Sequence, residues 1–261
     1  MPKFAANLSM LFNEFDFMDR FDAAAKAGFH GVEYLFPYDY PKQALVDALG
    51  RHGLKQVLHN LPAGDWSKGE RGVACLPGRE GEFQDGVGRA IQYAKALECD
   101  QLNCLVGIRP DGVPGDAVTR TLQDNLKFAA RALDAVGIRL LVEPVNNHDI
   151  PGFHLTTSAE TLRLFDDLGE KNLWLQYDIY HMQRMEGELT ATIARHLHRI
   201  AHIQLADNPG RNEPGTGEIN YNYLFRHLDA IGYGGWVGCE YKPKSTTLDG
   251  LSWLADAAIR A

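Results

Sequence analysis

Short apolar runs alternate with longer stretches of helical periodicity along the whole chain. The apolar runs predict eight strands, at residues 4–11, 31–36, 56–61, 102–106, 140–142, 173–178, 201–206 and 236–241. Between them, apolar residues recur every three or four positions and predict helices at residues 15–27, 41–51, 82–97, 118–136, 157–168, 189–198, 223–231 and 248–259. Strands and helices therefore follow one another in strict alternation.

Such alternation is typical of a parallel sheet covered by helices. Eight strand–helix units within 261 residues match a closed (β/α)8 barrel, also called a TIM barrel. No linker or change of composition divides the chain, so we predict a single domain over residues 1–261. A doubly wound open sheet is the alternative, but no GxGxxG motif follows the first predicted strand.

Oxygen-bearing side chains stand at the ends of four successive predicted strands. They are Glu143, Asp178, Gln204 and Glu240, separated by 35, 26 and 36 residues, about one repeat each. In a (β/α)8 barrel these strand ends meet at one mouth, where three carboxylates would repel one another unless a cation neutralises them. Oxygen donors alone favour a hard divalent ion, Mg²⁺ or Mn²⁺. The alternative is that each residue makes separate hydrogen bonds at its own strand end.

The segments around these residues resemble the hydroxypyruvate isomerase family, which belongs to the xylose-isomerase-like TIM barrels. The segments are VEPVNN at 142–147, QYDIYHMQ at 176–183, HIQLAD at 202–207 and GCEYKP at 238–243. The resemblance extends nearly end to end and includes ANLSM at 6–10, LHNLPAGDW at 58–66 and GEINY at 217–221. A sister group that resembles 2-oxo-tetronate isomerase shares the metal ligands. The His59–Asn60 pair and residues 180–183 favour hydroxypyruvate as the substrate.

The resemblance implies a metal-dependent interconversion of hydroxypyruvate and 2-hydroxy-3-oxopropanoate (tartronate semialdehyde). It also implies that Glu143 and Glu240 are the catalytic pair that transfers the proton. Moving a carbonyl group to the neighbouring carbon requires a proton to leave one carbon and reach the other through an enediolate. A metal ion bound to both substrate oxygens would stabilise the negative charge of this intermediate, and flanking carboxylates would carry the proton.

The small anionic substrate also needs partners for its carboxylate. Arg211, in the segment after the seventh strand, is our first choice and Lys242 the second; a solvated surface role for Arg211 is the alternative. We predict substrate contacts for His181, three residues after Asp178, and for His59 and Asn60 at the end of the third strand. The long glycine-rich segment at 62–81 carries Arg71 and Arg79, which could close over an anion or remain solvated.

Composition narrows the classes of partner. A net charge of −8 argues against nucleic acid and anionic membranes, and no stretch approaches the ~20 apolar residues of a membrane span. Four cysteines without a CxxC pair indicate reduced thiols, and we expect a cytoplasmic enzyme that could form a homo-oligomer. A metal-dependent DNA-repair nuclease or a non-catalytic sugar-acid binder on the same barrel remains the alternative function.

Overall fold

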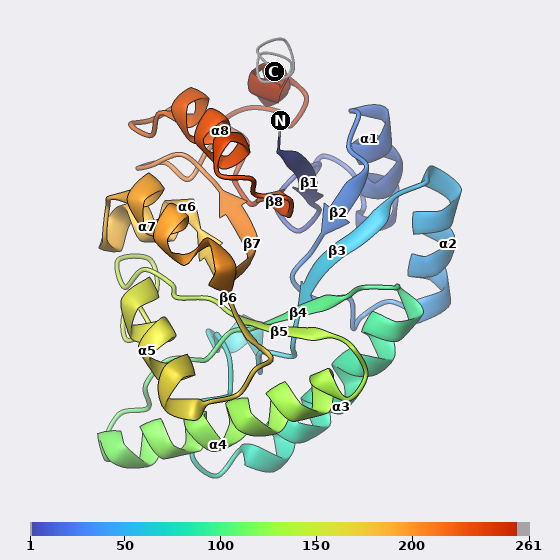
Figure 1. Cartoon of the computed structure of the whole chain (residues 1–261). Coiled ribbons are helices and arrows are strands. Elements are labelled where there is room, and N and C mark those ends of the chain that lie inside the picture. Colours follow the sequence, from blue (N-terminus) through green and yellow to red (C-terminus); the bar gives the residue numbers. More distant parts are fainter. Residues whose placement is uncertain (1, 255–261) are drawn as a thin grey trace.

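Eight parallel strands close into a barrel in this computed structural model, which describes residues 2–254 (Figure 1). The strands are β1 (Lys3–Asn7), β2 (Gly31–Glu33), β3 (Lys55–Asn60), β4 (Gln101–Cys104), β5 (Arg139–Val142), β6 (Leu173–Asp178), β7 (Ile200–Leu205) and β8 (Trp236–Cys239). Each strand pairs with its neighbour in sequence, and β1 also pairs with β8. The predicted closed barrel is confirmed.

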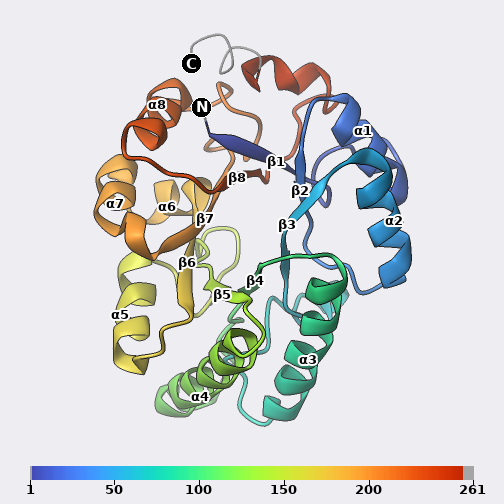
Figure 2. The same ribbon diagram turned by 45° about the vertical axis from the view of Figure 1, so that its right-hand side comes forward.

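The main helices lie outside the barrel and surround it (Figure 2). They are α1 (Arg20–Lys26), α2 (Lys42–His52), α3 (Glu80–Ala96), α4 (Gly115–Asp134), α5 (Ser158–Leu168), α6 (Ile179–Met185), α7 (Leu189–His196) and α8 (Tyr221–Ala230). In α4, for example, Leu122, Leu126, Ala129 and Leu133 are all buried. Their three- and four-residue spacing gives one apolar face that packs inward.

Several strands are shorter than the apolar runs predicted. The first ends at Asn7 rather than at residue 11, the second at Glu33 and the last at Cys239. Beyond these points the chain turns away while its apolar side chains, such as Leu11 and Tyr241, remain fully buried. The apolar pattern therefore continues past the last pair of the strand ladder. Of the predicted helix at 248–259, residues 249–254 are helical, and residues 255–259 lie outside the described part of the chain.

The short helix α6 follows β6 directly and was not predicted. Its first turn is stabilised by Asp178, whose Oδ1 accepts hydrogen bonds from the backbone N–H groups of Tyr180 (2.7 Å) and His181 (3.2 Å). Carboxylates are favoured caps at helix N-termini because these N–H groups have no partner within the helix. This cap fixes where His181 stands relative to the end of β6.

The interior of the barrel changes from apolar to polar along its axis. A cluster of Ala5, Val57, Leu58, Leu141 and Ala201 packs with Trp174 and Trp236. Along the strands towards their C-terminal ends follow buried polar side chains, which are Asn7, Glu33, Asn103, Gln176 and His202. Bulky branched residues commonly fill such barrels. Here a polar layer supports the mouth instead.

The four cysteines are free and buried, in agreement with the predicted reduced thiols. Burial raises the pKa of Cys75 to about 11 and that of Cys99 to about 12. Both thiols are therefore protonated near neutral pH and poor nucleophiles. No helix among residues 2–254 has the length and apolar character needed to cross a membrane.

Candidate active site

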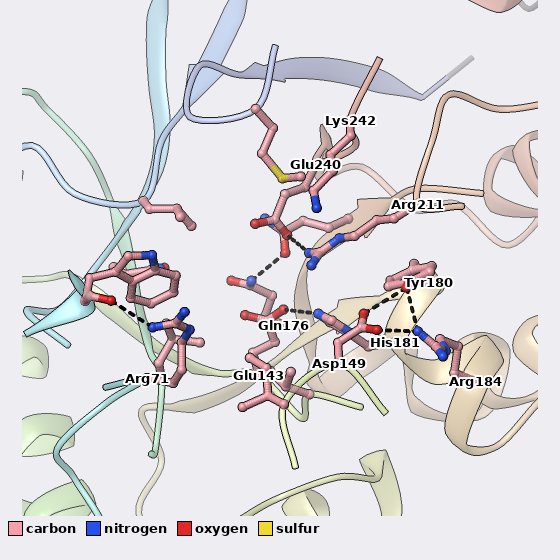
Figure 3. Close-up of a pocket in the computed structure, with 18 of the residues that line it drawn as sticks. Arg71, Glu143, Asp149, Gln176, Tyr180, His181, Arg184, Arg211, Glu240 and Lys242 are labelled. Atoms are coloured by element: carbon pink, nitrogen blue, oxygen red, sulfur yellow. Dashed lines mark hydrogen bonds and ion pairs between the residues drawn. The ribbon is translucent and has the colours of Figure 1, made fainter. Parts of the chain in front are cut away.

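A cavity of about 610 Å³ opens at the C-terminal ends of the strands. Seven of the nine predicted site residues line it, and Figure 3 shows several of them pointing into it. The seven are Asn60, Glu143, His181, Gln204, Arg211, Glu240 and Lys242. Asp178 is fully buried next to these residues, whereas His59 does not line the cavity.

Glu143 directly follows β5 and is only 5% exposed. Its Oε2 accepts a hydrogen bond from Asn103 Nδ2 at 3.0 Å. Burial raises the pKa of Glu143 well above its usual range, and the nearby carboxylates of Glu240 and Asp178 raise it further. This setting disfavours the charged form of the Glu143 carboxyl group unless positive charge lies nearby.

Asp178 supplies the clearest indication of a cation site. Its Oδ1 caps α6, but its Oδ2 is buried and has no hydrogen-bond partner among the described residues. Ligand atoms of Glu143, Asp178 and His181 all lie within 4.8 Å of one another, so this group could hold a metal ion. A buried carboxylate oxygen that accepts no hydrogen bond is costly, and a bound cation would satisfy it.

His181 stands between the two carboxylates, with Nε2 3.7 Å from Glu143 Oε1 and 3.9 Å from Asp178 Oδ2. Burial lowers the pKa of His181 to about 4, so the ring is neutral. Asn146 Nδ2 lies 2.6 Å from its Nδ1, and the backbone N–H groups of His148 and Asp149 hold Asn146 Oδ1 on the other side. Nδ1 therefore accepts, and the proton resides on Nε2. This tautomer favours a hydrogen-bond donor facing the cavity over a ligand through Nε2.

Glu240 follows β8 and faces the same cavity from the opposite side of the barrel. Its Oε2 accepts from Arg211 Nη2 at 3.2 Å, and the same Nη2 lies 4.0 Å from Asp178 Oδ2. Burial raises the pKa of Glu240, and Arg211 opposes the rise. Arg211 has φ of 54° and lies over the ring of Tyr180, 5.2 Å from its centroid. Its guanidinium is thus already engaged by carboxylates.

Gln204 takes part in a hydrogen-bonded chain within the barrel. Its Nε2 donates to Glu33 Oε1 at 2.7 Å, and its Oε1 accepts from Gln176 Nε2 at 2.6 Å. Gln204 pairs in register with Asp178 across β6 and β7. Asn60, at the end of β3, accepts from Asn103 Nδ2 at 3.1 Å.

His59 does not reach the cavity, so its position gives no support to a direct substrate contact. It is fully buried, its ring lies 6.1 Å from that of Tyr38, and neither ring nitrogen has a hydrogen-bond partner in residues 2–254. Burial lowers its pKa to about 3. Successive strand residues face opposite sides of a sheet, so Asn60 faces inward and His59 outward.

Some residues at the site were not among those predicted. Asn103 bridges Asn60 and Glu143, Gln176 bonds Gln204, and Asn146 orients His181. Strand alternation could have identified Gln176, which lies two residues before Asp178 on β6. In the long loop, Arg79 pairs with Glu70 and Glu82, whereas Arg71 lines the cavity.

Comparison with known proteins places this geometry in a family. The model for the xylose isomerase-like TIM barrel matches residues 21–257. The chain belongs to that family. It is 57% identical to the hydroxypyruvate isomerase of Escherichia coli (strain K12), over 97% of this chain and 98% of the relative. It is 45% identical to the 2-oxo-tetronate isomerase of Cupriavidus necator, again over 97% and 98%.

Solved structures agree with the fold. One described as an AP endonuclease, family 2, from Brucella melitensis superposes with a TM-score of 0.95 at 46% identity, covering 98% of this chain and 99% of that one. An L-ribulose 3-epimerase has a TM-score of 0.76 at 21% identity, a likeness of fold alone. The high identity and coverage of the isomerase relatives indicate that this chain is an isomerase.

The raised pKa of Glu240 predicts how stability depends on pH without a cation. The folded protein binds this proton more tightly than the unfolded chain, in which a glutamate titrates near pH ~4.3. Its contribution is complete below that value and is lost as pH rises through the folded-state pKa. In a chelating buffer, the free energy of unfolding of the wild type should fall more steeply with rising pH than that of Glu240→Gln. Urea titrations at several pH values measure this, and equal slopes would contradict the assignment.

Proposed function

We propose that this isomerase interconverts hydroxypyruvate and 2-hydroxy-3-oxopropanoate with the help of a divalent cation. The observation that carries the proposal is the pair of buried carboxyl groups, Glu143 and Glu240, facing one cavity beside Asp178 Oδ2, which accepts no hydrogen bond from the described residues. The 57% identity to a hydroxypyruvate isomerase supports the choice of substrate.

The residues present suit a hard divalent cation. We assign Glu143, Asp178, Gln204 and Glu240 as its ligands and favour Mg²⁺, with Mn²⁺ as the alternative, because carboxylate and amide oxygens bind these ions well. When bound, the cation would stabilise negative charge that develops on the substrate oxygens. The neutral Nε2–H of His181 would then contact a substrate oxygen as a donor.

The two glutamates divide the proton transfer. One carboxylate removes a proton from C3 of hydroxypyruvate, and the other carboxyl group delivers a proton to C2. The C3 hydroxyl loses its proton as it becomes the aldehyde, and the C2 carbonyl oxygen gains one. Positions after β5 and β8 allow the glutamates to approach the substrate from two sides. Carboxyl groups whose pKa is raised by burial suit both tasks near neutral pH.

The substrate carboxylate requires a cation that is not already paired. Arg211 is engaged by Glu240, and Arg184 pairs with Asp149. Among the described residues that line the cavity, Arg71 and Lys242 have no acidic partner within 4.0 Å. Arg71 stacks on Trp66, 3.9 Å from the ring centroid, and donates to the backbone oxygens of Trp66 and Glu70. We therefore add Arg71 to the candidates and rank Arg71 and Lys242 above Arg211, our first choice from the sequence, because Arg211 is already paired.

A longer oxo acid is the second candidate substrate, because the chain is 45% identical to a 2-oxo-tetronate isomerase. The ratio of kcat/KM for the two acids decides between them, and we expect hydroxypyruvate to give the larger value. The candidate metal-binding group of Glu143, Asp178 and His181 contains a single histidine. A multi-zinc centre of a nuclease would need more histidine ligands, so this group does not favour that function. Both glutamates are present, which favours an enzyme over a non-catalytic binder.

The proposal includes a cytoplasmic location, supported by the four free buried cysteines. A small anionic oxo acid is the expected partner. Formation of a homo-oligomer stays a prediction.

Substitution of either glutamate tests the proton transfer. Glu143→Gln and Glu240→Gln should each lower kcat by about 10²–10⁴-fold with saturating Mg²⁺, because an amide cannot accept and return the proton. Asp178→Ala should instead lose activity mainly through weaker cation binding, which added Mg²⁺ partly restores. Circular dichroism would verify that each variant is folded. Near-normal turnover of either glutamine variant with the cation bound would contradict the two-glutamate mechanism.

Arg71→Gln tests the contact with the substrate carboxylate. Loss of a charge-assisted hydrogen bond worth about 1.5–3 kcal/mol should raise KM for hydroxypyruvate about 10- to 100-fold and change kcat little. Arg120→Gln is the matched control, because Arg120 is exposed on α4, pairs with Asp116 and does not line the cavity. Steady-state kinetics measure KM for both variants. Equal KM values would exclude a contact between Arg71 and the substrate carboxylate.

A further inference from the structure

A carboxylate that the mechanism does not use lies at the centre of the barrel. Glu33, the last residue of β2, is fully buried and accepts hydrogen bonds from three side chains. The donors are Asn7 Nδ2 (3.0 Å), His202 Nε2 (2.7 Å) and Gln204 Nε2 (2.7 Å). Burying a carboxylate costs free energy unless hydrogen bonds satisfy its oxygens. Here three side-chain donors provide those hydrogen bonds.

The surroundings hold Glu33 in a single orientation. On β8, a Cβ at Gly238 would lie 2.3 Å from both Glu33 oxygens, so glycine leaves the room that the carboxylate occupies. Asn7 Oδ1 accepts from the backbone N–H of Ser9, which keeps its amino group towards Glu33. Gln101 Nε2 lies 3.5 Å from His202 Nδ1, which places the proton of His202 on Nε2. Each neighbour thus presents a donor.

A carboxylate in this setting dictates which end of an amide may face it. An ionised carboxylate only accepts hydrogen bonds, so the end of Gln204 beside Glu33 must be the amino group. The amide oxygen of Gln204 is then turned towards Gln176, on the strand that carries Asp178. A carbonyl oxygen has two lone pairs, and Gln176 occupies one of them. The other lone pair could serve a cation in the cavity that Gln204 lines.

We propose that Glu33 is a positioning residue that selects the orientation of Gln204 in which oxygen, and not the amino group, serves the cation site. The proposal rests on the proposed function, because it presumes that a cation binds there. Without the carboxylate, the amide of Gln204 could turn over and present its amino group to the cation, which repels it. Residues behind metal ligands commonly act in this way, and their loss typically weakens metal binding by about 10- to 100-fold.

A double-mutant cycle on positions 33 and 204 tests this role through direct binding of Mn²⁺, measured from the electron paramagnetic resonance signal of the free ion. The four proteins are the wild type, Glu33→Gln, Gln204→Glu and the double variant. Glu33→Gln should weaken Mn²⁺ binding about 10-fold or more, because its new amide no longer excludes the reversed orientation of Gln204.

In the Gln204→Glu background the effect of Glu33→Gln should largely disappear. A carboxylate at position 204 has two equivalent oxygens and no amino group that could turn towards the cation. The double variant should therefore bind Mn²⁺ about as tightly as Gln204→Glu alone. Simple loss of negative charge at position 33 would weaken binding equally in both backgrounds, so only the difference between the backgrounds reports orientation.

Every outcome bears on the proposal. Wild-type affinity in Glu33→Gln, or equal weakening in both backgrounds, would overturn it. If Glu33→Gln does not fold, the double variant must still bind Mn²⁺ about as tightly as Gln204→Glu, and a loss of about 10-fold there overturns the proposal equally. Absence of Mn²⁺ binding by the wild type would instead remove the cation from the proposed function, which separates the two failures.

Discussion

Mutual repulsion among buried carboxyl groups is the constraint on which this active site depends. Glu143, Asp178 and Glu240 face one another in a region from which water is largely excluded, and burial raises the pKa of both glutamates. Such a group is stable only if it is protonated or is neutralised by positive charge. Arg211 supplies part of that charge, and Asp178 Oδ2, which accepts no hydrogen bond from the described residues, indicates where the rest would bind.

The polar layer beneath the mouth explains how the barrel tolerates this arrangement. Hydrogen bonds from Asn103 to Glu143 and from Gln176 to Gln204 tie each inward-facing side chain to a neighbouring strand. Glu33 and His202 continue the network across the barrel. A bulky aliphatic interior would leave these polar groups without partners, at a cost of about 1–3 kcal/mol for each one. Fold and site are therefore coupled through side chains that touch no substrate.

Sequence alone was sufficient for the closed barrel and for placing Glu143, Asp178, Gln204 and Glu240 at the same end of it, because alternation and spacing are periodic properties. It was not sufficient for His59, because a short apolar run does not reveal which side chains face inward. Helix α6 is only seven residues long and begins within the apolar pattern of β6, so periodicity could not distinguish it. The pairing of Arg211 with Glu240 depends on a loop conformation with positive φ at Arg211, which no pattern in the sequence predicts.

The central claim is that two glutamates move a proton between neighbouring carbons of a 2-oxo acid. Incubation of hydroxypyruvate with the protein and Mg²⁺ in D₂O, followed by NMR of the C3 hydrogens, tests it most directly. The account predicts Mg²⁺-dependent loss of the C3–H signal, with deuterium also appearing at C2 of the product. If the C3–H signal stays constant with the cation present, over a period long enough for many turnovers per protein molecule, the claim is contradicted.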